Sequence, residues 1–181
     1  LGPVKLNLQK RASPFEALVE AIIYQQLHGK AAKTIFERMK ALFPKTRFPK
    51  PEAFLKMSEK KFRSAGVSGA KTAAIKDLAK KTIDGLVPSQ QKIQKLSNDE
   101  IVERLTQIRG IGRWTVEMLL IFKLGRKDVL PATDFAIRKA FGILYSKSEM
   151  PPPKAILSYG EMWSPYRTAA SLYLWKSLDS K

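Results

Sequence analysis

The residues best suited to chemistry lie in one stretch, TQIRGIGRWTVEMLLIFKLGRKDVLPATDFAIR, which covers residues 106–138. It contains a glycine pair, Gly110 and Gly112, flanked by Arg109 and Arg113, and a carboxylate, Asp134, farther along. Glycines at a helix start let a phosphate approach the backbone N–H groups closely. The phosphate could belong to a nucleotide cofactor or to a nucleic acid, and Asp134 would have a different task in each case.

A dinucleotide-binding loop has the pattern G-x-G-x-x-G after a strand, with an acidic residue about 20 positions on. Asp134 has that spacing, but Thr115 stands where the third glycine belongs, and the preceding residues predict a capped amphipathic helix. The stretch therefore predicts a helix, a tight hairpin over 108–112 and a second helix whose first N–H groups face an anion. Such a contact holds a phosphate backbone without distinguishing bases. An ordinary helix–helix turn that needs glycine is the alternative.

The elements around this motif are predicted to be helical, since no segment shows the alternation typical of strands. Ser13-Pro14 predicts a helix start, and Ser97 with Glu100 predicts a capping box. Residues 1–12 are expected to form an arm, and the proline-rich segments 44–51 and 151–153 to form loops. The expected helices cover residues 13–23, 32–43, 51–55, 58–65, 70–83, 97–108, 114–122, 134–144 and 167–178.

Composition bounds the class of protein. The chain has 181 residues, 44% of them hydrophobic, which suits one domain over residues 1–181. Its 33 Lys and Arg against 16 Asp and Glu give a formal charge of +17. Such an excess predicts a polyanionic partner, with nucleic acid ahead of an anionic membrane, and a merely soluble basic protein is the alternative.

Several chemistries are excluded or disfavoured by single residue types. The chain has no cysteine, so disulfides, a thiolate nucleophile and cysteine-ligated zinc or iron–sulfur sites are excluded. One histidine, His28, makes a histidine metal site or a serine–histidine triad a poor choice. No apolar run reaches the ~18 residues of a membrane span, and no signal-peptide pattern is found. We expect an intracellular protein without membrane association.

Two motifs carry a family resemblance. L-x-x-I-x-G-I-G-R-W-T from residue 105, followed by V-L-P-x-x-D-x-x-I-R from residue 129, resembles the helix-hairpin-helix superfamily of DNA glycosylases. More narrowly, it resembles the bacterial and fungal 3-methyladenine DNA glycosylases of type II. Residues 13–32 and 163–175 support the resemblance, which covers residues 13 to about 178.

The resemblance implies a fold and an activity. We expect an all-α, two-lobed bundle with a cleft between the lobes and with the helix-hairpin-helix motif at about 99–122. We expect a monomer that acts in base excision repair, flipping alkylated purines such as 3-methyladenine and 7-methylguanine out of double-stranded DNA and hydrolysing their glycosidic bonds. Its location would be the nucleus of a eukaryote, or the cytoplasm and nucleoid of a prokaryote.

Asp134 falls on the family's catalytic aspartate. An alkylated purine is cationic and leaves readily, so one carboxylate that stabilises the oxocarbenium-like sugar and directs water is sufficient. The alternative is that Asp134 only caps the helix that follows it. Thr133 departs from relatives that carry a second acid or a glycine before the aspartate, and Arg109 replaces a frequent proline.

Aromatic residues are the candidates for a pocket that binds a cationic base through cation–π contact. They are Trp114, Trp163 and Trp175, with Tyr24 and Tyr166 behind them. The resemblance places Trp114 and Trp175 nearest the base, whereas each aromatic residue considered alone is more often part of a core.

The remaining site residues are expected to contact DNA. By resemblance, Gln26 fills the hole left by the flipped base and His28 touches the minor groove; the alternatives are a surface glutamine and an incidental loop histidine. The candidates for phosphate contact are Arg109, Gly110, Gly112, Arg113, Lys71 and the helix cap Ser68. No cofactor is required by the resemblance, although carbonyls of Thr106, Ile108 and Gly110 could hold Na+ or K+, as in relatives.

Trp114 also bears on the type of reaction. Members of the superfamily that nick the strand carry a lysine at this position and form a Schiff base with the sugar. Tryptophan cannot, so a glycosylase without lyase activity is predicted, and Lys123, Lys127 and Lys139 are interpreted as solvated or phosphate-facing charges. The competing hypotheses are a non-catalytic helix-hairpin-helix DNA-binding module and a glycosylase-lyase for oxidised or mismatched bases.

Overall fold

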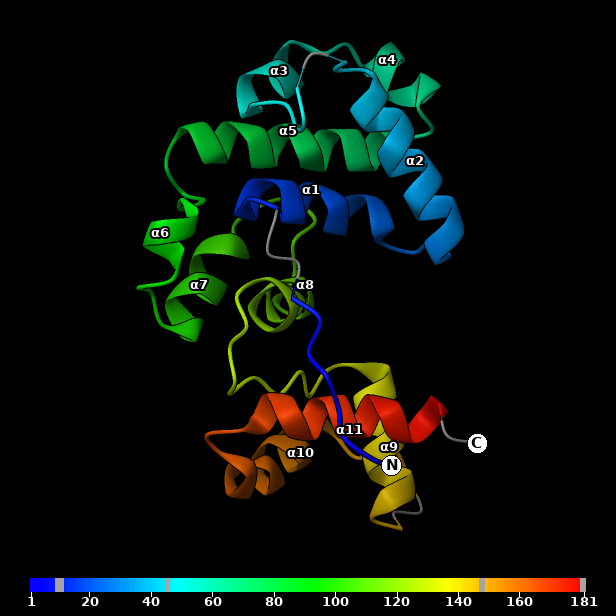
Figure 1. Cartoon of the computed structure of the whole chain (residues 1–181), viewed down its shortest axis with the longest axis vertical. Coiled ribbons are helices and arrows are strands. Elements are labelled where there is room, and N and C mark those ends of the chain that lie inside the picture. The colour runs from blue at the N-terminus through cyan, green and yellow to red at the C-terminus, as the bar shows by residue number, and fades with distance from the viewer. Residues whose placement is uncertain (9–11, 45, 147–148, 180–181) are drawn as a thin grey trace. The chain divides into compact units, whose positions relative to one another are not determined.

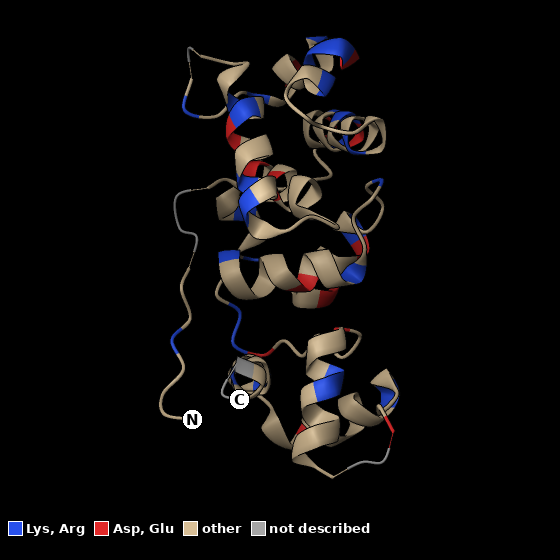
Figure 2. Cartoon of the chain, turned by 90° about the vertical axis from the view of Figure 1, so that its right-hand side faces the viewer, with Lys and Arg blue, Asp and Glu red and all other residues tan. Residues whose placement is uncertain are grey.

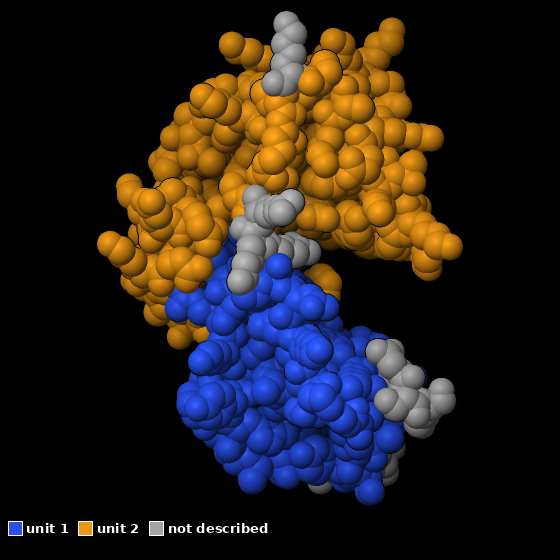
Figure 3. All heavy atoms as spheres, viewed as in Figure 1, with its two compact units in different colours: residues 1–10, 117–181 blue, residues 11–116 orange. Residues whose placement is uncertain are grey.

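A computed structural model of the chain describes residues 1–8, 12–44, 46–146 and 149–179. Within these ranges every regular element is helical and no strand occurs (Figure 1), which confirms the all-α prediction. The chain divides into two compact units: unit 1 contains residues 1–10 and 117–181, and unit 2 contains residues 11–116 (Figure 3). That the two units form one domain with a cleft between lobes stays a prediction.

Unit 2 is organised around one long helix, α5 (Gly69–Ile83), which packs against α1 and α3 (Figure 1). Its core includes the fully buried side chains of Leu18, Ile22, Ile75 and Leu78. The other helices of this unit are α1 (Pro14–Tyr24), α2 (Gly29–Ala41), α3 (Pro51–Lys56), α4 (Glu59–Ser64), α6 (Gln90–Ile93), α7 (Asn98–Leu105) and the first residues of α8 (Arg113–Met118).

Serine caps set the starts of several helices in unit 2, as the sequence predicts. The Ser13 hydroxyl accepts a hydrogen bond from the Glu16 N–H at 3.1 Å, and Pro14 occupies the first turn of α1. At α7, Ser97 and Glu100 form the predicted capping box. Local sequence is therefore sufficient to place these helix starts.

Unit 1 contains α9 (Phe135–Leu144), α10 (Pro153–Gly160), the 3₁₀ turn η2 (Glu161–Trp163) and α11 (Arg167–Asp179). Helix α11 packs against α9. The buried residues of this core are Leu130, Ala132, Ile137, Ala140, Phe141, Ile156 and Leu174. The predicted N-terminal arm has no regular structure over residues 1–8.

Several predicted helices and loops differ from those in the structure. The predicted helix 114–122 is α8 followed by a π-helical turn, η1 (Leu119–Lys123), where the Leu124 N–H donates to the Leu119 carbonyl at 3.0 Å. The predicted loop 151–153 ends early, because Pro153 starts α10 at a position where a missing N–H costs nothing. Helix α2 begins at residue 29, not 32, and α7 ends at residue 105, not 108. Helices α6 and α10 were not predicted.

Candidate active site

The glycine pair forms the hairpin between α7 and α8, as predicted. The Ile111 N–H donates to the Ile108 carbonyl at 3.0 Å, and the Gly112 carbonyl accepts from Val116 at 3.2 Å as α8 begins. Gly110 has φ +77, and a Cβ there would lie 3.3 Å from that of Ala74 on α5. This position therefore needs glycine both for its left-handed backbone and for its close packing.

The outer surface of the hairpin is exposed and basic. Arg109, Gly110, Gly112 and Arg113 are all exposed, whereas Ile111 between the glycines is buried. Lysines and arginines lie on helices of both units (Figure 2). An anionic backbone could thus reach the hairpin, although the contacts predicted for these four residues stay predictions.

Two side chains of α5, Asp77 and Lys81, hold the hairpin in place. The Asp77 carboxylate accepts hydrogen bonds from the Arg109 N–H at 2.8 Å and from the Lys81 ammonium at 2.9 Å. The Lys81 ammonium also donates to the Gln107 carbonyl. Burial alone would raise the pKa of Asp77, but these donors lower it overall. The sequence analysis missed Asp77 and Lys81, whose i,i+4 spacing on a predicted helix was the available signal.

Lys71 has a different set of partners from the predicted phosphate. Its ammonium donates to the carbonyls of Ile23 and Gln25, both at 2.8 Å, at the C-terminal end of α1. Burial lowers the pKa of Lys71. Two of its three N–H donors are therefore used inside the protein, and its contact with phosphate stays a prediction. Ser68 is the N-cap of α5, as predicted, accepting from the Lys71 N–H at 3.4 Å.

Gln26, the candidate wedge that would fill the hole left by a flipped base, lies in the turn between α1 and α2. Gln26 is exposed and has φ +55, a left-handed conformation that is uncommon for a residue other than glycine. His28 is also exposed and occupies the N-cap position of α2. The roles of both side chains in the DNA groove stay predictions.

Asp134 is held by two hydrogen bonds in unit 1. Its Oδ1 accepts from the Ile137 N–H at 2.8 Å, so Asp134 is the N-cap of α9. The same oxygen accepts from the indole Nε1–H of Trp175 at 3.1 Å. The side chain is half-buried. Capping and catalysis are compatible here, because a cap residue holds its carboxylate in one orientation.

Trp175 is the aromatic candidate that the structure brings to Asp134. Its ring stacks on Phe122 of η1, with centroids 5.9 Å apart and an interplanar angle of 28°. The sequence analysis did not single out Phe122. The chemistry available around Asp134 is therefore a fixed carboxylate beside two stacked aromatic rings, which suits a cationic or electron-poor ligand.

The other aromatic candidates lie in different surroundings. Trp163 packs edge-to-face on Phe141 and Tyr159 in the core of unit 1. Tyr166 belongs to unit 1 and is 61% exposed. Trp114, 44% exposed, and Tyr24 belong to unit 2. A pocket built from residues of both units stays a prediction.

The prediction that Lys123 is solvated or faces phosphate is wrong. The sequence analysis interpreted it as a solvated or phosphate-facing charge, but it is only 5% exposed. It is the last residue of η1, and the π-helical turn there shifts side-chain positions relative to those of the predicted α-helix. Lys127 and Lys139 are exposed, as predicted.

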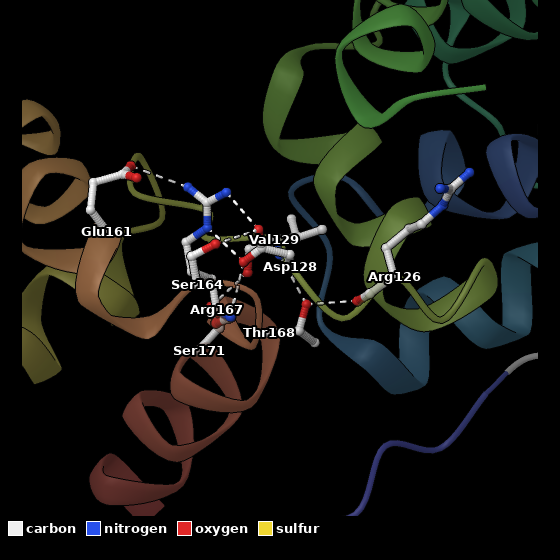
Figure 4. A network of polar contacts seen from close by, with 8 residues as sticks. All are labelled: Arg126, Asp128, Val129, Glu161, Ser164, Arg167, Thr168 and Ser171. Atoms are coloured by element: carbon white, nitrogen blue, oxygen red, sulfur yellow. Dashed lines mark hydrogen bonds and ion pairs between the residues drawn. The ribbon is translucent and has the colours of Figure 1, made fainter.

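A polar network holds the segment that leads to Asp134 (Figure 4). Arg167, at the start of α11, forms a bidentate ion pair with Asp128, with Nε–Oδ1 and Nη2–Oδ2 distances of 2.7 Å. The Ser164 hydroxyl donates to the same carboxylate at 3.2 Å. The hydrogen bonds from Arg167 lower the pKa of Asp128 in spite of its partial burial.

Hydroxyl groups of α11 extend this network along the backbone. The Thr168 hydroxyl donates to the Arg126 carbonyl at 2.7 Å and accepts from the Val129 N–H at 3.1 Å. The Ser171 hydroxyl donates to the Val129 carbonyl at 3.1 Å. Residues 126–129 are thus fixed to the same helix that carries Trp175. Sequence reasoning missed this network, since nothing in the spacing pairs residue 128 with residue 167.

The hairpin carbonyls offer the donor type that a monovalent cation prefers. The Gly110 carbonyl accepts from Gln25 Nε2 at 2.8 Å, and the Ile108 carbonyl accepts from the Ile111 N–H. A carbonyl oxygen has two lone pairs, so these bonds are compatible with a further ligand. Among the residues that the structure describes, no group of three His, Cys, Asp or Glu side chains could hold a metal ion.

The fold and the site together define a helix-hairpin-helix protein with a capped carboxylate beside stacked aromatic rings. The chain belongs to the HhH-GPD superfamily of base excision DNA repair proteins, whose family model matches residues 19–165. None of the helices in the described ranges is long and apolar enough to cross a membrane.

Relatives of the chain have DNA repair names. It is 45% identical over 168 residues to DNA-3-methyladenine glycosylase 1 of Schizosaccharomyces pombe, covering 93% of this chain and 74% of the relative. A structure of the 3-methyladenine DNA glycosylase from that yeast in complex with abasic DNA matches with a TM-score of 0.87 and 44% identity, covering 98% and 87% of the two chains. A DNA-3-methyladenine glycosidase from Bacillus halodurans matches with a TM-score of 0.87 and 35% identity, covering 98% and 80%.

Proposed function

We propose that this chain is a DNA-3-methyladenine glycosylase of type II, a monofunctional enzyme of base excision repair that removes alkylated purines from double-stranded DNA. The observation that carries the proposal is the Asp134 carboxylate, held by the Ile137 N–H and the Trp175 indole in a chain of this superfamily. The 45% identical yeast relative, which is named DNA-3-methyladenine glycosylase 1, supports the substrate class.

The proposed chemistry needs one carboxylate. The lesion is first flipped out of the duplex, at a cost of about a few kcal/mol. As the bond between C1′ and the purine nitrogen breaks, the base leaves with the bonding electron pair, which neutralises its positive charge. Asp134 stabilises the cationic sugar. A water oxygen then bonds to C1′ and releases its proton, leaving an abasic site.

The absence of strand cleavage is proposed from position 114. A lyase forms a Schiff base between an amine and C1′, and the Trp114 side chain has no amine. Borohydride reduction should therefore trap no covalent adduct between this protein and a lesion duplex. A trapped adduct would favour the alternative, a glycosylase-lyase for oxidised or mismatched bases.

We propose that the protein binds DNA as a monomer and does not associate with a membrane. The charge of +17 and the exposed Arg109 and Arg113 beside the hairpin support binding to a phosphate backbone. We propose that no cofactor takes part in the reaction and that Na+ or K+, if bound, would be held by carbonyls of Thr106, Ile108 and Gly110. The proposed location is intracellular, with the DNA of the cell.

The test is base release from duplexes that contain 3-methyladenine, 7-methylguanine, ethenoadenine or hypoxanthine, with wild type and Asp134→Asn compared under single-turnover conditions. Asparagine keeps an oxygen that can accept from Ile137 and Trp175, so the fold should be preserved while the charge is lost. We expect release to slow by about 10²-fold or more. Equal rates would refute the mechanism, and wild-type binding without release would favour a non-catalytic DNA-binding module.

A further inference from the structure

The turn that carries Gln26 is connected to the hairpin by its neighbour, Gln25. The Gln25 side-chain amide donates through Nε2 to the Gly110 carbonyl at 2.8 Å, across 85 positions of sequence. The Gln25 carbonyl accepts from the Lys71 ammonium at 2.8 Å, and its N–H donates to the Ala21 carbonyl at 3.2 Å. Backbone and side chain of this one residue therefore join α1, α5 and the hairpin.

Gln26 needs such support because its backbone is strained. A left-handed conformation is unfavourable for a residue with a Cβ. It persists only where neighbouring contacts hold it. Gln25 precedes it directly and is fixed at both its carbonyl and its side chain. The Gln26 side chain is thereby presented from a turn whose position is set by the hairpin.

We propose that Gln25 is a positioning residue that fixes Gln26 relative to the hairpin. When the hairpin binds the DNA backbone, Gln26 is thereby placed at the stacked bases. This inference rests on the proposed function. It explains why the residue is an amide: the Gly110 carbonyl requires a donor, which glutamate cannot supply, and Nε2 of glutamine provides one at the required reach. The hydrogen bond is exposed, so its net effect is modest, corresponding to about a threefold to tenfold change in rate.

The inference predicts a dependence on base pairing. A wedge matters where a flipped base leaves a hole opposite a stacked partner, and matters less where the opposite strand has no base. A misplaced Gln26 should therefore slow excision from a paired duplex more than from a duplex with an abasic analogue opposite the lesion. A general loss of folding or of chemistry would slow both substrates equally.

The experiment measures single-turnover release of 7-methylguanine opposite cytosine and opposite an abasic analogue. Gln25→Glu removes the donor, and Gln25→Met removes it without adding charge, which keeps the test valid if the glutamate variant folds poorly. Ser64→Ala is the control, because this exposed side chain also donates to a carbonyl, that of Lys61 at 2.8 Å, but lies on α4 and does not join the turn to the hairpin.

We expect both Gln25 variants to slow release from the cytosine duplex about threefold to tenfold and from the abasic duplex less than about twofold. Ser64→Ala should remain within about twofold of wild type on both. Equal slowing on the two substrates, or no slowing, would overturn the inference. A wild type that releases no base would instead count against the proposed function, and only that outcome would do so.

Discussion

The ion pair between Asp128 and Arg167 should stabilise unit 1 more than an ordinary surface pair. Both side chains are about three-quarters buried, with exposures of 28% and 25%, and the contact is bidentate. We consider Arg167→Met, Asp128→Asn and the double variant. Arg167→Met leaves the partly buried Asp128 carboxylate without this guanidinium, which is the costly case, whereas Asp128→Asn leaves Arg167 its second ion pair, with Glu161 at 3.3 Å.

The magnitude follows from this geometry. A hydrogen bond to a charged group contributes about 1.5–3 kcal/mol. Two such bonds at one-quarter exposure are weakened by solvent screening, so we expect Arg167→Met to lower the free energy of unfolding by about 2 kcal/mol. For a chain of this length that is a decrease in Tm of about 4–8 °C. The coupling energy of the pair should be about 1–2 kcal/mol.

Two assays test this prediction. Urea unfolding of the four proteins gives the double-mutant cycle, and single-turnover base release reports on Asp134, which lies six residues beyond Asp128 in the anchored segment. We expect the rate of release to fall more than duplex affinity, because the pair belongs to the unit that carries Asp134, whereas the hairpin belongs to unit 2. Glu37→Gln is the control: Glu37 pairs with Lys40 but is 56% exposed, so its loss should cost under about 1 kcal/mol. Additive effects of the two substitutions, or a cost equal to that of Glu37→Gln, would refute the reasoning.

Three further predictions concern the hairpin and pH. Gly110→Ala should lower the free energy of unfolding by about 1–2 kcal/mol, because alanine is strained at φ +77 and its Cβ would crowd Ala74; unchanged urea denaturation would contradict this. Arg113→Ala should reduce the slope of log Kd against log salt by about one, and an unchanged slope would remove Arg113 from the phosphate contacts. The hydrogen bonds from Arg167 lower the pKa of Asp128 in the folded protein, so its contribution to stability is present above the pKa of the unfolded chain and is lost as pH falls through the folded pKa. The Tm should therefore decline less on acidification in Asp128→Asn than in wild type.

Much of the fold could be predicted because its signals are local. A serine with a proline after it, or with a glutamate three residues on, determines a helix start through contacts within one turn. The π-helical turn at 119–123 could not be predicted this way, since its shifted hydrogen bonds depend on packing within unit 1. Pro153 misled for a related reason: a proline that breaks a helix interior is also well suited to a first turn.

The candidate site was predictable only in part. The cap at Asp134 follows from local sequence, and its helix was predicted with the correct start. The indole donor of Trp175 and the arginine paired with Asp128 come from another helix, and nothing in the spacing indicates them. For Lys71 the sequence suggested a partner but did not indicate the contacts inside the protein. Charge and family resemblance suggested phosphate, whereas its ammonium donates to two carbonyls of α1.

The N-terminal residues belong to unit 1, and this has a consequence for how the protein is made. Leu8 packs over Gly125, and the Lys176 ammonium donates to the Pro3 carbonyl at 3.1 Å. During synthesis these first residues leave the ribosome long before their partners exist, whereas unit 2 is continuous in sequence and emerges next. Because domains generally fold as they emerge, the hairpin's unit should be folded first. The unit that carries Asp134 can be completed only when α11 has been synthesised.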